Sequence, residues 1–228
     1  MSDQKQSAFE QCVTQTSRRI GKLWAALGET ENCITNNTPE KAFDCAMTLA
    51  EEAEKFTLLT RALPAYTGNP LALDKVDEMV NQTIPVKIGF TENGWFYLCI
   101  PALLPKKGKG SPSYIRAFLY PAMRRFFHEK APTIYPDCVL VFRHVYQRDR
   151  PERQYRDHDN IELNMVADIV AFHVMKDDTP LRCSHYYCSA AGAVDQTEVF
   201  VVPQIEFMSW LQFNQSRCEE EVIVHENR

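Results

Sequence analysis

Aspartates near the middle of the chain have the spacing expected of ligands to a hard divalent cation. Asp157 and Asp159 lie two residues apart, and Asp177 and Asp178 follow an apolar stretch further along the chain. Residues two apart in extended backbone point to the same side, so the first two carboxylates can face one ion. Together with Asp178 they would form an oxygen-rich pocket, which suits Mg²⁺. We therefore predict a metal site and catalytic centre at Asp157, Asp159 and Asp178.

The third carboxylate reaches the first two only if the intervening helix is short. The apolar run predicts a helix over residues 160–172, which would be roughly 20 Å long. Residues 173–178 can cover about the same distance in extended form. The three aspartates can therefore meet if the helix ends near Phe172. They cannot meet within one copy if it continues to Lys176.

Each of these acids also has a structural interpretation. Asp159 is a good helix N-cap, with Glu162 three residues later as its capping-box partner. The pair Asp177-Asp178 is typical of a turn. Asp157 can form an ion pair with a neighbouring arginine. The catalytic and the structural interpretations both stay open on the sequence alone.

Positive charge is concentrated upstream of the acids. Five arginines and two acids occupy positions 143–156, and a basic turn occupies positions 105–110. Such cations on the rim of an acidic pocket are typical of a site that cleaves phosphodiesters. Away from such a rim they would be ordinary solvated loops. The predicted nucleic-acid contacts are Lys106, Lys107, Lys109, Arg148, Arg150, Arg153 and Arg156.

The first third of the chain has the pattern of amphipathic helices. Apolar residues recur every three or four positions from Phe9 onward, and Gly28 is expected to stop this helix. Thr38-Pro39 predicts the start of a second helix, which ends at Pro64. A weaker third helix is expected over residues 71–81. Residues 1–83 therefore form a predicted helical extension built around a hairpin.

From residue 84 the pattern alternates between strands and helices, which predicts an α+β fold. A small mixed sheet with packed helices is expected over residues 84–203, followed by a short helix and tail over 204–228. The turn signal at residues 91–94 predicts a hairpin, and the last two strands are expected to form another. Strands are expected at 86–90, 95–100, 138–146, 181–188 and 197–202, with helices at 111–130 and 160–172.

The bulk composition is that of an ordinary globular protein, with 45% hydrophobic residues, 24% charged residues and a net charge of −5. No apolar stretch approaches the length of a membrane span, so we expect a cytoplasmic protein without membrane contacts. The eight cysteines include no Cys-x-x-Cys pair, which predicts reduced thiols. Cys183, His185 and Cys188 lack a fourth ligand at the usual spacing, which argues against zinc.

Residues 84–202 resemble the RusA-like Holliday-junction resolvases, a family of crossover junction endodeoxyribonucleases. The matching segments are 153–160, an arginine-rich turn followed by Asp-x-Asp-Asn, and 176–178, which ends in Asp-Asp. The first and last acids are separated as in that family. The resemblance implies that Asp157, Asp159 and Asp178 hold Mg²⁺, which activates a water, and that Asn160 and Asp177 shape the site. The family's usual catalytic lysine is replaced here by Leu163.

Two functions follow from this resemblance. The first is a Mg²⁺-dependent, structure-selective endonuclease that resolves Holliday junctions in branched DNA as a homodimer, an activity of DNA recombination and repair often carried by prophages. The second is a non-catalytic relative that binds nucleic acid or protein on the same scaffold, with the N-terminal helices as a contact surface. The lysine replacement and the net negative charge favour the second. Signatures of other enzyme classes, such as a phosphate loop or Gly-x-Ser-x-Gly, do not occur.

Overall fold

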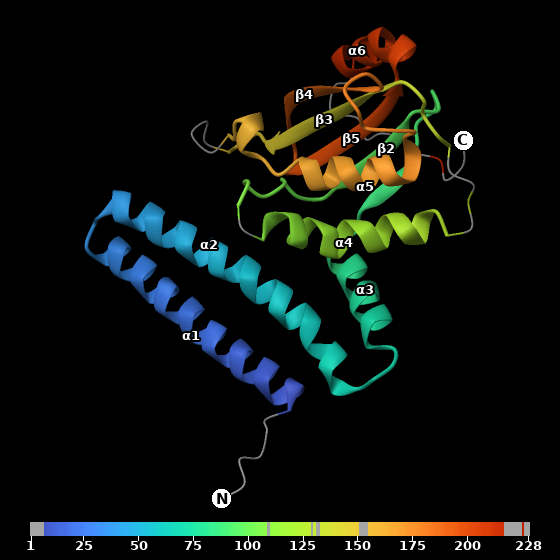
Figure 1. The fold of residues 1–228 in the computed structure, drawn as a ribbon. Helices are drawn as coiled ribbons and strands as arrows, with labels where there is room; N and C mark the ends of the chain where they lie inside the picture. The colour runs from blue at the N-terminus through green and yellow to red at the C-terminus, as the bar shows by residue number, and fades with distance from the viewer. Residues whose placement is uncertain are drawn as a thin grey trace, which may run out of the picture. The chain divides into compact units, whose positions relative to one another are not determined.

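The computed structural model describes residues 7–108, 110–128, 130, 133–150, 155–216 and 225. The chain divides into two compact units, Met1–Met79 and Val80–Arg228. The first unit is helical, and the second combines helices with a mixed sheet, which confirms the α+β fold class (Figure 1). Among the described helices, none combines the length and apolar character that crossing a membrane requires.

Two long helices, α1 (Ala8–Thr35) and α2 (Pro39–Ala62), form the hairpin predicted for the first unit. An ion pair joins them, with Arg19 Nη1 2.5 Å from Glu52 Oε2. The hairpin is followed along the chain by η1 (Leu63–Thr67) and α3 (Ala72–Thr83).

The first helix is longer than its sequence pattern indicated. A capping box defines its start, because Glu10 N donates to Ser7 Oγ at 3.2 Å and Ser7 N donates to Glu10 Oε2 at 2.8 Å. The helix then continues through Gly28, so the predicted stop at that residue is wrong. A glycine inside a helix costs only about 1 kcal/mol relative to alanine, which the surrounding helical residues outweigh.

The second unit is built on a five-stranded sheet in the order β1-β2-β5-β3-β4. Every neighbouring pair is antiparallel except β3 and β4, which are parallel. The predicted turn closes the β1–β2 hairpin, where Gly94 has a φ of 75° and donates its N–H to Thr91 O at 2.8 Å. The strands are β1 (Lys87–Phe90), β2 (Phe96–Ile100), β3 (Cys138–Gln147), β4 (Cys183–Gly192) and β5 (Gln196–Pro203).

The last two strands do not form the predicted hairpin. β5 lies between β2 and β3 and is antiparallel to both, whereas β4 pairs with the other edge of β3. The helix between β3 and β4 makes them a strand–helix–strand unit, and such a crossover produces parallel strands. β3 therefore separates two strands that are adjacent in sequence.

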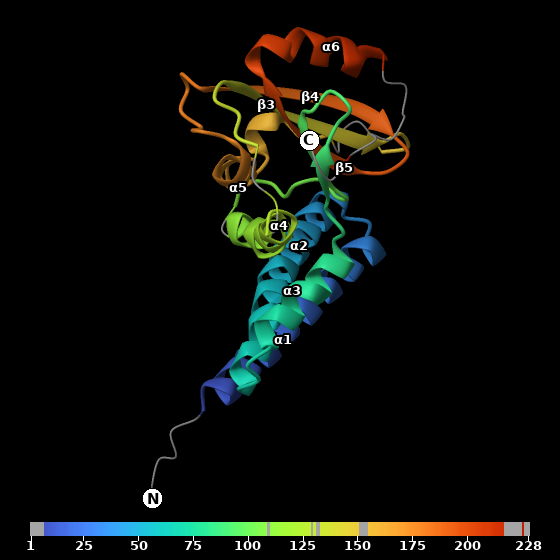
Figure 2. The ribbon, with the colours of Figure 1, turned by 90° about the vertical axis from the view of Figure 1, so that its right-hand side faces the viewer.

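Helices cover both faces of the sheet. α6 (Phe207–Ser216) lies on one face, and α4 (Ser111–Phe126) and α5 (Asn164–Val174) lie on the other (Figures 1 and 2). Trp210 of α6 is fully buried in a cluster that contains Val139 and Val141 of β3. Side chains alternate along a strand, so Phe142 and His144 point to the opposite face.

A buried ion pair joins two central strands. Arg143 of β3 and Glu198 of β5 are register partners, and Arg143 Nη1 donates to Glu198 Oε2 at 2.6 Å. The same carboxylate accepts from Tyr97 Oη and Gln196 Nε2, each at 3.2 Å. Arg143 is one of the five arginines at positions 143–156, but its side chain is only 9% exposed and is part of the sheet.

Removing the guanidinium is expected to destabilise the protein strongly. Arg143→Met leaves a buried carboxylate without its cation, which should lower the free energy of unfolding by about 3–5 kcal/mol. Urea denaturation followed by circular dichroism measures the change. Arg182→Met, which removes the half-exposed Arg182–Asp137 pair, is the matched control and should have little effect. Equal losses in the two variants would contradict this account of the sheet.

Candidate functional site

The acidic motif lies between the end of β3 and the start of α5. Asp157 and Asp159 are both exposed and belong to the short turn around η3 (His158–Asn160). α5 begins at Asn164, four residues later than predicted, and Leu163 occupies its N-cap position. The interpretation of Asp159 as the cap of this helix is therefore wrong. Glu162 lies nearer the helix start, where its Oε1 accepts from Met165 N at 3.4 Å.

Asp177 and Asp178 lie in the turn before β4. α5 ends at Val174, two residues beyond the predicted end, and Met175 then pairs with Tyr135 in an isolated bridge. Asp177 Oδ1 accepts from Thr179 N at 3.1 Å, which confirms the turn interpretation of this acid. Asp178 is exposed. Interaction with Cys183, and to a smaller extent the charge of Asp178, raises the pKa of His185.

Parallel pairing keeps the two acidic segments apart. The Asp157 turn follows the end of β3, whereas Asp178 precedes the start of β4, so they occupy opposite ends of the strand pair. His158, next to Asp157, has its Nε2 3.2 Å from Ser189 Oγ, whereas Asp178 lies near His185. Ser189 is four residues, about 13 Å, along β4 from His185.

The fit to Mg²⁺ is correspondingly poor. In the part of the chain that the structure describes, no three His, Cys, Asp or Glu side chains are grouped so that they could hold a metal ion. Asp157, Asp159 and Asp178 thus do not form a common ligand set. Their catalytic and metal-binding roles, and the shaping roles of Asn160 and Asp177, stay predictions from the sequence.

The basic turn lies directly beside the acidic motif. Lys106 forms a β-bridge with Ile161, and Lys107 N donates to Asn160 O at 2.8 Å. Both lysine side chains are exposed. The sequence alone left open whether these two segments meet, and in the structure they do. Lys109 lies outside the described residues.

Two of the four predicted arginine contacts are held by protein groups. Arg150 binds Asp195, with Nε 3.2 Å from Oδ1, and so ties the end of β3 to the β4–β5 connection. Arg156 donates to Leu104 O, and burial lowers the pKa of its guanidinium. Arg148 is exposed. Arg153 lies outside the described residues.

A stripe of exposed rings runs beside this segment on β4. His185 and Tyr187 are two residues apart, so their side chains lie on the same face of β4, which forms an edge of the sheet. The Tyr187 ring lies 5.8 Å from the ring of His158 and 5.8 Å from that of Phe142, both in a stacked orientation. Tyr187 nevertheless remains 38% exposed. In the sequence, the alternation of His185 and Tyr187 along a predicted strand was the signal that could have indicated this stripe.

A buried histidine lies under the stripe. His144 of β3 is fully buried, and neither of its ring nitrogens has a hydrogen-bond partner among the described residues. Its ring centroid is 5.6 Å from that of His158. Burial, aided by the charges of His158 and Arg156, lowers the pKa of His144 to about 4, so its ring is neutral at pH 7.

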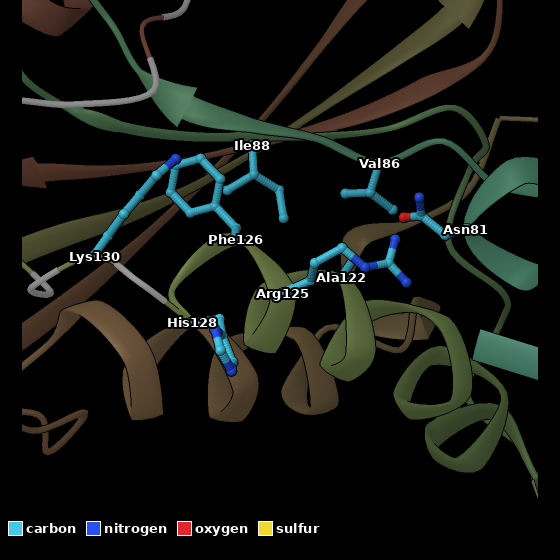
Figure 3. Close-up of a pocket in the computed structure, with 8 residues that line it drawn as sticks. All are labelled: Asn81, Val86, Ile88, Ala122, Arg125, Phe126, His128 and Lys130. Carbon is cyan, nitrogen blue, oxygen red and sulfur yellow. The ribbon is translucent and has the colours of Figure 1, made fainter. Parts of the chain in front are cut away.

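A hollow of about 470 Å³ lies between α4 and β1 (Figure 3). Its lining includes Arg125, His128 and Lys130, and the Nζ of Lys130 lies 3.9 Å from the ring centroid of Phe126. The positive charge of Arg125 in the last turn of α4 is favourable next to the negative end of the helix dipole. The lining contains none of the predicted site residues.

Comparison with known proteins assigns the family. The sequence profile of a family of unknown function, DUF6100, matches residues 4–228. The chain belongs to the DUF6100 family. No curated protein matches it. Membership of DUF6100 brings no activity with it, so function has to be argued from the geometry, and the resemblance to RusA-like resolvases stays a prediction.

The buried histidine predicts acid-sensitive stability for this DUF6100 protein. The pKa of His144 is lower when folded than the ordinary 6.5, so the unfolded chain binds more protons between these values. The free energy of unfolding should therefore fall by about 3 kcal/mol as the pH drops from 6.5 to 4. His144→Phe should remove most of this loss, as measured by urea denaturation across that pH range. Parallel pH profiles for the two proteins would contradict the assignment.

Proposed function

We propose that this DUF6100 protein binds nucleic acid without using a metal ion. The observation that carries the proposal is the position of the basic turn, which is hydrogen-bonded alongside the segment that carries His158. Exposed lysines thus lie beside the segment whose His158 ring stacks on the exposed Tyr187 ring. Grooves that bind single strands commonly combine these two kinds of group.

The rings would contact bases. Tyr187 and His158 are stacked and accessible at the sheet edge, and every base has a flat face that can stack on such a ring. This contact does not depend on base sequence, so we expect little sequence preference.

The lysines would contact phosphates. Lys106 and Lys107 are exposed, and the backbone of their turn is fixed against residues 160–161. A fixed backbone limits the entropy lost when the side chains bind a phosphate. Arg150 and Arg156 have a structural role instead, because their guanidinium groups already bind Asp195 and the carbonyl oxygen of Leu104.

Metal-dependent cleavage has less support than binding. A nuclease of the RusA-like kind requires the three aspartates around one ion, and the described residues do not form that group. Leu163 also provides no charge to a scissile phosphate, and its side chain is buried. The second of the two sequence-based hypotheses therefore agrees better with the geometry.

Binding should depend on the ring and the lysines but not on metal. Fluorescence anisotropy with labelled single-stranded DNA, single-stranded RNA and a four-way junction measures it, in EDTA and in Mg²⁺. Tyr187→Ala should raise the Kd at least about fivefold, since stacking contributes about 1–3 kcal/mol per base. Lys106→Glu with Lys107→Glu should weaken binding to all probes and reduce its salt dependence.

Tyr66→Ala is the matched control, because Tyr66 is a half-exposed tyrosine in η1 of the first unit. No binding at low salt would exclude the proposal and favour a protein partner. Mg²⁺-dependent nicking of the junction that Asp159→Asn abolishes would instead restore the nuclease hypothesis.

We also propose that two copies associate through the helical hairpin. Its helices fully bury only Cys12 and Ala26 among the described residues, which is a small core for two long helices. An apolar stripe on α1 remains between 39% and 69% exposed. A second hairpin placed on this stripe would complete a four-helix bundle. The stripe consists of Phe9, Val13, Ile20 and Trp24.

Trp24→Glu should convert the dimer to a monomer, because it places a charge in the stripe that the second copy would bury. Light scattering after size-exclusion chromatography measures the mass. Ala25→Glu introduces the same charge one position along, at an exposed residue outside the stripe, and should leave the dimer intact. A monomeric wild-type protein at micromolar concentration would rule this association out.

A further inference from the structure

Two cysteines meet where the parallel strands begin. Cys138 and Cys183 are direct partners in the β3–β4 ladder, both are buried, and neither forms a disulfide. Neighbouring strands lie about 4.8 Å apart. This spacing is within the Cα–Cα separation that a disulfide spans, so the sulfurs can be joined without moving the strands.

A histidine completes the arrangement on the exposed side. His185 follows Cys183 by two residues, so the two side chains share a face of β4. Interaction with Cys183, and after it the charge of Asp178, raises the pKa of His185. Nδ1 of His185 lies 3.0 Å from Tyr187 Oη.

The two thiols are electrostatically unequal. Interaction with the Cys138 thiol, and after it with His185, lowers the pKa of the Cys183 thiol. The same contact and burial raise the pKa of Cys138. Deprotonation is therefore favoured at Cys183 rather than at Cys138. Thiolates are the nucleophilic form of cysteine.

Cys183 neighbours both of the other side chains, Cys138 across the strand pair and His185 along β4. A metal site would need its donors around one point, and the described residues contain no group of three such donors. The Cys183 sulfur can therefore attack an electrophile while His185 supplies a proton and Cys138 a second thiol. That division of roles is the one used by reactive cysteine pairs.

We propose that Cys138 and Cys183 form a reactive dithiol that is oxidised by hydrogen peroxide, with His185 as the proton donor. The Cys183 thiolate attacks one peroxide oxygen, which forms an S–O bond and breaks the O–O bond. The departing hydroxide takes the proton of His185 and leaves as water. Cys183 is then a sulfenic acid.

Cys138 completes the reaction. Its sulfur attacks Cys183 Sγ, which forms the S–S bond and breaks the S–O bond. The hydroxide that leaves takes up the Cys138 proton, directly or through His185. In sum, two thiols lose two electrons and two protons, and one hydrogen peroxide becomes two waters. The product is a disulfide between the first residues of β3 and β4.

Peptide mass spectrometry of the full chain tests this chemistry. The reduced protein is treated with one equivalent of hydrogen peroxide, quenched with N-ethylmaleimide and digested. We expect a linked peptide that contains Cys138 and Cys183. Cys138→Ser should instead trap the sulfenic acid of Cys183 as a dimedone adduct, and His185→Gln should slow oxidation about tenfold through loss of the imidazolium.

The chain contains its own control. Cys33 and Cys45 of the helical hairpin are a second pair of neighbouring thiols, with their sulfurs 3.8 Å apart. Burial, and then Cys33 and nearby acids, raise the pKa of Cys45. These two thiols are therefore close together, but Cys45 is not activated as a thiolate. The Cys138–Cys183 link should form first in the same sample. Earlier or equal oxidation of Cys33–Cys45, or an unchanged rate in His185→Gln, would overturn the proposal.

Discussion

Parallel pairing of β3 with β4 determines where the chemically active side chains of the second unit lie. Because both strands run in the same direction, the chain must cross from the end of one to the start of the other, and α5 makes this crossing. Asp157 therefore lies at one end of the pair and Asp178 at the other. The same pairing brings Cys138 beside Cys183. One topological choice separates the expected metal ligands and creates the thiol pair.

Charged groups in this unit hold the fold together more than the sequence suggests. Arg143 is buried against Glu198 in the sheet, and Arg150 fastens the β4–β5 connection through Asp195. Each pairing removes positive charge from the surface that a count of arginines would assign to it. The cations left beside the rings come mainly from the short basic turn, which explains why a protein of net charge −5 can still present a local cationic edge.

Local sequence patterns predicted most of the elements but not their neighbours. The β1–β2 hairpin follows from its turn residues, and the helical hairpin follows from apolar periodicity and the proline at position 39. The β4–β5 hairpin was wrong, because two adjacent strands have the same pattern whether they pair directly or a third strand separates them. The site had the same difficulty. No sequence pattern indicates that His144 is a buried ring without hydrogen-bond partners. Nor does any pattern indicate that Cys138 lies beside Cys183, which is 45 residues further along the chain.

The central position of β5 has a consequence for biosynthesis. This strand is paired on both sides, with β2 and with β3, so it alone connects the first hairpin to the crossover unit. β2 and β3 leave the ribosome well before β5, and the edges that will pair with β5 stay unpaired until then. Closure of long loops is slow relative to local pairing, so the nascent sheet stays exposed to wrong partners until Gln196–Pro203 emerges. Chaperone binding during translation would act in that interval.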